Sequence, residues 1–144
     1  MLRQLSPTAY AAGQIDPSTL PELKAEGIAR VINNRPDNEE FSQPSSAVMA
    51  AAAAQAGMGY EHLPVATGLD PETIIAARAA LAEPGATLLY CKSGVRSALL
   101  WAAAEAAGGA DIEGIIAAAA NAGFELRPYR ALLAEVARVI GAAG

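Results

Sequence analysis

The sequence predicts an α/β fold in which a mainly parallel sheet of four or five strands is flanked by helices. Short apolar runs of strand length alternate along the chain with longer segments of helical pattern. Glycine and proline separate these segments and keep the connections short. Alternation of strands and helices with short connections is typical of βαβ units, whose strands lie parallel in one sheet.

The residue pattern divides the chain into successive elements. We predict strands at residues 28–33, 59–63 and 87–91, with a weaker candidate at 10–14. We predict helices between Ser18 and Gly27 and at residues 46–56, 71–82, 96–107, 112–121 and 128–141. A polar loop is expected at residues 34–45, where charged and turn-forming residues replace the apolar pattern.

Local signals support these boundaries. Residues 28–33 (IARVIN) are apolar and β-branched without a helical stripe, which indicates a buried strand. Ser18 can cap the preceding helix and Gly27 can end it. Asp70 precedes a proline, which is a common helix start because proline is favoured at the first helical position. Residues 87–91 (TLLYC) form an apolar run of strand length.

The length of 144 residues predicts a single domain that spans residues 1–144. Apolar residues make up 53% of the chain and charged residues 17%, a balance that excludes intrinsic disorder. Alanine accounts for 36 residues. Because alanine favours helix but has little side-chain surface to bury, we expect helices that pack closely together.

The single cysteine, Cys91, and the single histidine, His62, exclude several kinds of site. They rule out an internal disulfide, a cysteine-rich zinc site and a histidine cluster, so we predict no metal and no cofactor. A net charge of −5 argues against binding to nucleic acid or to an anionic membrane. We expect a cytoplasmic protein, because the sequence shows no long apolar span and no signal-peptide pattern.

The segment from Cys91 to Ser97 carries the strongest functional signal. Cys91 ends a predicted strand and Arg96 opens a predicted helix, and ligands of open α/β sheets bind where strands end and helices begin. Loop N–H groups and the helix dipole stabilise a thiolate there, and an arginine can hold an oxyanion with two parallel hydrogen bonds. We therefore predict Cys91 and Arg96 as the catalytic pair. The rest of the predicted anion-binding loop is Lys92, Ser93, Gly94, Val95 and Ser97.

The alternative interpretation is that Cys91 is a small buried apolar residue at the end of a strand, a common place for a free cysteine. Glycine at position 94, inside the segment, favours the functional interpretation, because it lets the loop backbone adopt a conformation that a side chain would obstruct.

Three segments in the same order also resemble one known family: GQIDPSTLPELKAEGIARVINNRPDNEE, YEHLPV and CKSGVRSALLW. They are similar to the phosphatase-like domain of bacterial beta-lactamase hydrolase-like proteins, and the similarity extends over residues 3–140. The resemblance implies a protein-tyrosine-phosphatase-like fold, with Cys91 as nucleophile, Arg96 as anion clamp and residues 92–95 as a backbone cradle. The same domain also occurs fused to persulfide-oxidising enzymes, and its members are often labelled sulfurtransferases.

The loop departs from the protein tyrosine phosphatase pattern in two ways. Four residues rather than five separate Cys91 from Arg96, and Tyr90 stands where those enzymes usually have histidine. Four-residue spacing resembles the rhodanese loop, which cradles a persulfide sulfur. Because a shorter loop makes a smaller ring of N–H donors, it should fit a terminal sulfur better than a tetrahedral phosphate.

Three further residues are candidates at the rim of the site. Asp70 lies on a loop after a strand, where it could act as the general acid of a phosphatase or simply cap the next helix. Asp37 is a second candidate for the acid. Arg35 follows a strand directly, so it could help to bind an anion or could pair with a nearby carboxylate and order its loop.

We therefore predict first a cysteine-dependent sulfurtransferase that carries sulfane sulfur as a Cys91 persulfide. The first alternative is a hydrolase of phosphate monoesters that uses the same Cys91 and Arg96. The second alternative is a non-enzymatic anion-binding or redox-sensing module, because an exposed cysteine of low pKa is readily oxidised. The predicted partners are small-molecule or protein thiols, persulfides or phosphate esters, and the sequence predicts no particular oligomeric state.

Overall fold

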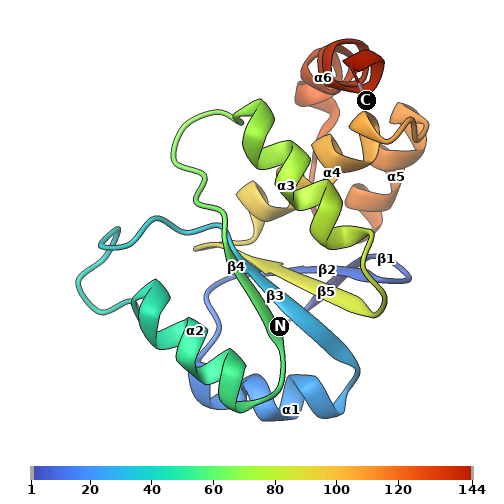
Figure 1. Ribbon diagram of the computed structural model, residues 1–144. Helices are drawn as coiled ribbons and strands as arrows, with labels where there is room; N and C mark the ends of the chain where they lie inside the picture. The colour runs from blue at the N-terminus through green and yellow to red at the C-terminus, as the bar shows by residue number, and fades with distance from the viewer. Residues whose placement is uncertain (1, 144) are drawn as a thin grey trace.

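A computed structural model describes residues 2–143 of the chain. Five strands form one sheet in the order β1-β2-β5-β3-β4 (Figure 1). The strands are β1 (Arg3–Ser6), β2 (Ala9–Ala12), β3 (Ile28–Asn33), β4 (Gly59–His62) and β5 (Ala86–Tyr90). Strands β2, β5, β3 and β4 are parallel, and β1 is antiparallel to β2. The predicted fold class is confirmed.

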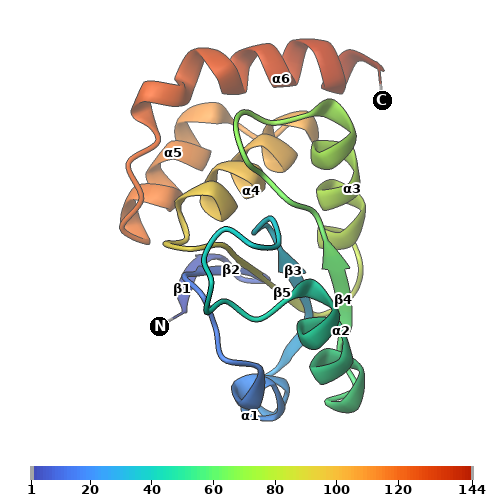
Figure 2. The ribbon, with the colours of Figure 1, turned by 90° about the vertical axis from the view of Figure 1, so that its left-hand side faces the viewer.

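Helices cover both faces of the sheet (Figures 1 and 2). One face carries α1 (Leu20–Ala25) and α2 (Ser46–Gln55). The other carries α3 (Pro71–Leu81), α4 (Val95–Ala107), α5 (Ile112–Asn121) and α6 (Arg130–Ala143). Short 3-10 turns at Pro17–Thr19 and Arg127–Tyr129 lead into α1 and α6. Within residues 2–143, no helix combines the length and apolarity needed to cross a membrane.

Alternation along the central strands builds two apolar layers. In β3, Val31 packs toward α1 and α2 while Ile32 packs toward α3 and α4, and Leu88 and Leu89 of β5 divide in the same way. Helix α4 lies between α3, α5 and α6, and its alanines are buried. Because alanine side chains are small, α4 can approach these neighbours closely.

The N-terminal part differs from the sequence-based prediction. Strand β1 was not predicted, and the weak candidate at residues 10–14 is the strand β2, which ends two residues earlier. The prediction that Ser18 caps this helix is wrong, because Ser18 donates a hydrogen bond here instead of accepting one. Its N–H lies 2.8 Å from the carboxylate of Asp16, which caps the first turn. A carboxylate accepts this hydrogen bond more strongly than a hydroxyl does.

Candidate active site

The carboxyl ends of four parallel strands meet at one edge of the sheet. The residues that follow these strands are Gly13 after β2, Asn34 after β3, Leu63 after β4 and Cys91 after β5. The loops that follow β3 and β4 leave the sheet at this edge (Figure 2). The topology therefore brings the predicted cysteine loop together with the loops at residues 34–45 and 63–70.

Cys91 is fully buried at the N-terminal end of α4. Its Sγ accepts the backbone N–H of Gly94 at 3.1 Å, and Gly94 has a φ of 95°, a left-handed conformation that favours glycine. Burial raises the pKa of the thiol, but hydrogen bonds from Ser97 and from two loop N–H groups outweigh burial and leave the pKa below its usual value. Those two N–H groups belong to Ser93 and Gly94. The loop thus favours a thiolate.

Arg96 is fixed beside this sulfur by two loops. Its Nη1 and Nη2 donate to the two carboxylate oxygens of Glu39 at 2.7 and 3.0 Å. Nη1 also donates to the backbone carbonyl of Val65 at 2.7 Å. The pKa of Arg96 lies above its usual value because of Glu39 first and also because of the nearby Cys91. A guanidinium held on one side by a carboxylate can still offer N–H groups to an anion at the sulfur.

Glu39 joins Arg96 to a second arginine. Its Oε1 accepts the Nε of Arg35 at 2.8 Å, and Arg35 is almost completely buried. Arg35 also donates to Glu40 and, at 2.9 Å, to the side-chain oxygen of Gln14. Hydrogen bonds from the two arginines, that of Arg96 first, lower the pKa of Glu39 to about 2. With these partners Arg35 orders its loop, which agrees with the second of the two roles predicted for it.

Asn34 connects three strand ends, a role that the sequence did not predict. Its backbone N–H donates to the carbonyl of Tyr90 at 2.8 Å, and its side-chain amide donates to the carbonyl of Leu63 at 2.9 Å. Its Oδ1 accepts the hydroxyl of Ser97 at 2.7 Å. An asparagine directly after a buried strand was the available signal. For Glu39, also missed, the signal was its position four residues after Arg35.

The end of β2 supports the cysteine loop from the other side. The N–H of Gln14 donates to the carbonyl of Lys92 at 3.3 Å. A Cβ at Gly13 would lie 2.9 Å from that same carbonyl, so only glycine allows this approach. Lys92 itself is exposed, and its Nζ lies 3.6 Å from the carboxylate of Glu40. The cradle is therefore held from both neighbouring strands.

The two candidate acids lie in different environments. Asp37 accepts the backbone N–H of Ser46 at 2.7 Å, so its carboxylate binds the first N–H of α2, whose N-cap is Ser45. Asp70 stands at the N-cap position of α3, but its exposed side chain makes no capping hydrogen bond. It lines a cavity of about 460 Å³ together with Pro36 and Val65. Since Val65 also contacts Arg96, this cavity adjoins the cysteine site, although no contact joins Asp70 to Cys91.

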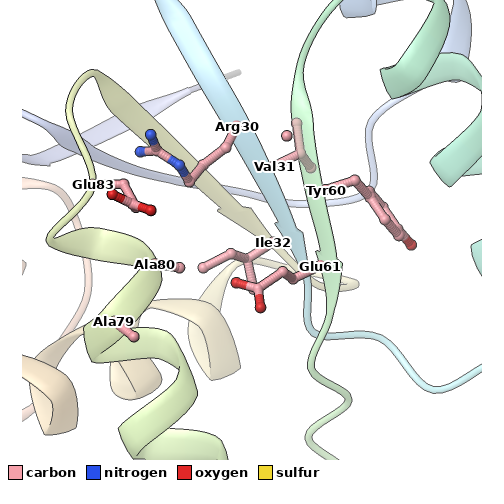
Figure 3. A pocket seen from close by; sticks show the side chains of 9 residues that line it. Arg30, Val31, Ile32, Tyr60, Glu61, Ala79, Ala80 and Glu83 are labelled. Carbon is pink, nitrogen blue, oxygen red and sulfur yellow. The ribbon is translucent and has the colours of Figure 1, made fainter.

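A separate cavity of about 340 Å³ lies along the outer strand β4 (Figure 3). Ile32, Glu61 and Ala80 are among the residues that line it. Arg30, at one end, donates to the side chain of Thr87 at 2.7 Å and to backbone carbonyls of the turn before β5. The residues that line this cavity include no cysteine, serine or histidine, so we place the candidate chemistry at Cys91.

Comparisons with known proteins identify the family and the fold of the chain. The family model "Beta-lactamase hydrolase-like protein, phosphatase-like domain" matches residues 1–108. A beta-lactamase hydrolase-like protein of Agrobacterium fabrum is 39% identical over 101 residues, which are 68% of this chain and 23% of that protein. The chain thus spans about a quarter of the length of the curated relatives that it matches.

Two solved structures show the same fold. The nma1982 protein of Neisseria meningitidis, which carries a provisional phosphatase name, has a TM-score of 0.77 and 31% identity, covering 93% of this chain and 96% of that chain. Tk-PTP in its active form has a TM-score of 0.72 and 15% identity, covering 98% and 96%. At that identity the second likeness shows the fold alone. The chain belongs to the beta-lactamase hydrolase-like phosphatase domain family, and its fold is protein-tyrosine-phosphatase-like.

Proposed function

We propose that this member of the family hydrolyses phosphate monoesters, with Cys91 as nucleophile and Arg96 as anion clamp. The observation that carries the proposal is the fixed guanidinium of Arg96 beside a sulfur that already receives loop N–H groups. A transferring phosphoryl group spreads its charge over three oxygens, so it needs several donors held in place in advance. One neighbour of this fold, TpbA of P. aeruginosa, was crystallised with phosphotyrosine, and its TM-score is 0.65.

The proposed reaction has two steps. The Cys91 thiolate attacks phosphorus, the bond from phosphorus to the ester oxygen breaks, and a cysteinyl-phosphate forms while the leaving alkoxide takes a proton. Water then attacks this phosphorus, the P–S bond breaks, and inorganic phosphate and the thiolate are released. The loop N–H groups and Arg96 hold the phosphoryl oxygens in both steps.

Asp70 is the better candidate for the acid that protonates the leaving group. Its carboxylate has no capping bond and the residue lines the cavity beside Val65, whereas the carboxylate of Asp37 already accepts the first N–H of α2. A positioned acid accelerates such a step by about 10²–10⁴-fold. The segment that carries Asp70 has to approach the leaving group when substrate binds.

Sulfur transfer, the first prediction from the sequence, rests on the four-residue spacing and on the sulfurtransferase label of the resembling family, and it stays a prediction. The phosphatase alternative is better supported, because both the family and the fold are phosphatase-like. The sensor alternative also stays a prediction.

One experiment separates these functions. The wild-type protein and Cys91→Ser are assayed with an aryl phosphate and, in parallel, with thiosulfate and a thiol acceptor. We expect phosphate release by the wild type and a loss of about 10⁴-fold or more in the variant. Sulfur transfer without phosphate release would overturn the proposal. Circular dichroism of both proteins controls for folding.

A further inference from the structure

Gln14, two residues after the end of β2, contacts the cysteine loop through its backbone. Its N–H donates to the carbonyl of Lys92 at 3.3 Å, and close by the N–H of Cys91 donates to the carbonyl of Ala12 at 3.2 Å. A Cβ at Gly13 would lie 2.9 Å from the Lys92 carbonyl oxygen, so the two backbones are in close contact. These contacts seat the first residues of the cysteine loop on the end of β2.

The hydrogen bond from Gln14 to Lys92 fixes the direction of the next N–H group. A peptide unit is planar and trans, so its C=O and its N–H point in opposite directions, and no peptide bond in the described part of the chain is cis. The carbonyl of Lys92 points to Gln14, so the N–H of Ser93, in the same peptide unit, points away from Gln14. This N–H is one of the two loop groups that donate to the sulfur of Cys91. By holding one carbonyl, Gln14 therefore aims one donor of the anion cradle.

The side chain of Gln14 is fixed at both of its polar atoms. Its Oε1 accepts Nη1 of Arg35 at 2.9 Å, and its Nε2 donates to the carbonyl of Ile15 at 2.9 Å. Arg35, which is almost completely buried, also binds Glu39, and Glu39 binds both terminal nitrogens of Arg96. The same residue thus contacts the cysteine loop with its backbone and the arginine network with its side chain.

The cradle N–H groups and the guanidinium of Arg96 have to hold the same phosphoryl group, so their relative position has to be set before the reaction. We propose that Gln14 is a positioning residue for phosphoryl transfer: it keeps the Ser93 N–H facing the sulfur and links this donor to the network that holds Arg96. The inference rests on the proposed phosphatase function. Gln14 acts through its neighbours, because within the described chain it makes no hydrogen bond to either catalytic residue.

The test removes the side-chain contacts of Gln14 and leaves its backbone N–H in place. Gln14→Met keeps the length of the side chain but offers no oxygen to Arg35, whereas Gln14→Glu keeps an acceptor oxygen. Gln43→Met is the matched control. Gln43 is also half-buried and bound at both amide atoms, to the carbonyl of Pro36 and the N–H of Glu40, and within residues 2–143 it makes no hydrogen bond to the cysteine loop or to Arg35.

The kinetic readout separates positioning from loop stability. We expect Gln14→Met to lower kcat/KM for p-nitrophenyl phosphate by about 10-fold, mostly through kcat, because a misplaced donor weakens binding of the transition state more than binding of the substrate. Gln14→Glu should recover most of this loss, and Gln43→Met should lose less than about 2-fold. Combined with Glu39→Gln, Gln14→Met should lose less than the product of the two separate losses, because both substitutions loosen the same network.

A titration of the thiolate gives a readout that does not depend on turnover. Cys91 is the only cysteine of the chain, so the ultraviolet absorbance of the thiolate reports this residue alone. A thiolate that loses an N–H donor is less stable, so Gln14→Met should raise the pKa of Cys91 by about 1, whereas Gln43→Met should leave it unchanged. The charged side chains of the site are the same in both variants: Arg96, Glu39, Arg35, Lys92 and Glu40.

The outcomes distinguish this inference from the proposed function. Equal effects of Gln14→Met and Gln43→Met on the pKa and on kcat/KM would overturn the role of Gln14, while hydrolysis by the wild type still supports a phosphatase. A wild type that releases no phosphate would overturn the proposed function, and the titration would still decide whether Gln14 holds the Ser93 donor in place. Urea titrations control for folding. If Gln14→Met does not fold, Gln14→Glu decides: kcat close to wild type supports the inference, and a loss of about 10-fold or more contradicts it.

Discussion

Two loops reach Arg96 from neighbouring strands, and they are held in different ways. The loop at residues 34–45 contacts Arg96 through the carboxylate of Glu39 and is braced by the buried Arg35. The loop at residues 63–70 contacts it through the carbonyl of Val65. Beyond Val65, residues 66–69 make no hydrogen bond within the described part of the chain.

This difference matches two different chemical tasks. An oxyanion clamp has to be in place before the reaction, because reorienting a charged group during the reaction would raise the barrier. A general acid has to reach a leaving group whose position depends on the substrate, so its loop benefits from freedom to adjust. The loop at residues 34–45 is therefore suited to holding the Arg96 guanidinium in place. The loop at residues 63–70 is suited to bringing an acid to the leaving group.

The largest expected effect comes from breaking the contact that both loops share. Arg96→Lys keeps the charge but cannot span Glu39, Val65 and the anion at once, because an ammonium has no planar fork. We expect kcat/KM for an aryl phosphate to fall by about 10³-fold. Lys92→Ala is the control, because it removes an exposed cation of the same cysteine loop. We expect it to change kcat/KM by less than about 10-fold. Similar losses in both variants would mean that charge alone is needed.

The second-largest effect is expected for a substitution in the loop at residues 63–70. Asp70→Asn should lower kcat by about 10²-fold for alkyl phosphates, whose leaving groups need a proton, and far less for p-nitrophenyl phosphate. The free energy of unfolding should not change, because the carboxylate makes no capping bond. Urea titrations of the wild type and of Asp70→Asn measure this free energy. A loss of stability with unchanged kinetics would instead identify Asp70 as a helix cap.

Glu39→Gln tests the braced loop and should have a smaller kinetic effect. The amide removes the ion pairs with Arg96 and Arg35, so we expect about 10-fold lower kcat/KM and about 2 kcal/mol less stability. Glu40→Gln is the matched control, because Glu40 is more exposed and does not contact Arg96. Equal destabilisation by both substitutions would show that Glu39 has no special role.

The same carboxylate predicts a pH dependence. The pKa of Glu39 is lowered from 4.5 to about 2 in the fold, chiefly by Arg96. A lowered pKa means that the folded state binds the proton more weakly than the unfolded chain. The stabilisation is therefore complete above about pH 4.5 and disappears as the pH falls toward 2. Unfolding measured across this range should be less steeply pH-dependent in Glu39→Gln, and equal slopes would contradict the assignment.

The sequence predicted the fold and the centre of the site because both depend on local patterns. Apolar runs, glycine and proline mark the strands and helices, and the cysteine loop lies between one strand and the next helix. Glu39 and Asn34 escaped prediction because their partners, Arg96 and Ser97, are 57 and 63 positions away along the chain. Asp70 was predicted with two roles, acid or cap, because its sequence context fits both, and the missing capping hydrogen bond is an observation that only the geometry supplies.

The smallest expected effect concerns Asp37, the acidic residue of the braced loop. Its carboxylate accepts the N–H of Ser46, so Asp37→Ala should lower the free energy of unfolding by about 1 kcal/mol. Asp37→Asn keeps an acceptor oxygen and should remain close to wild type in stability. Neither variant should change kcat for an alkyl phosphate. If Asp37→Asn lost activity while Asp70→Asn did not, the braced loop would supply the proton as well as the fixed charge, and the division of tasks between the two loops would be wrong.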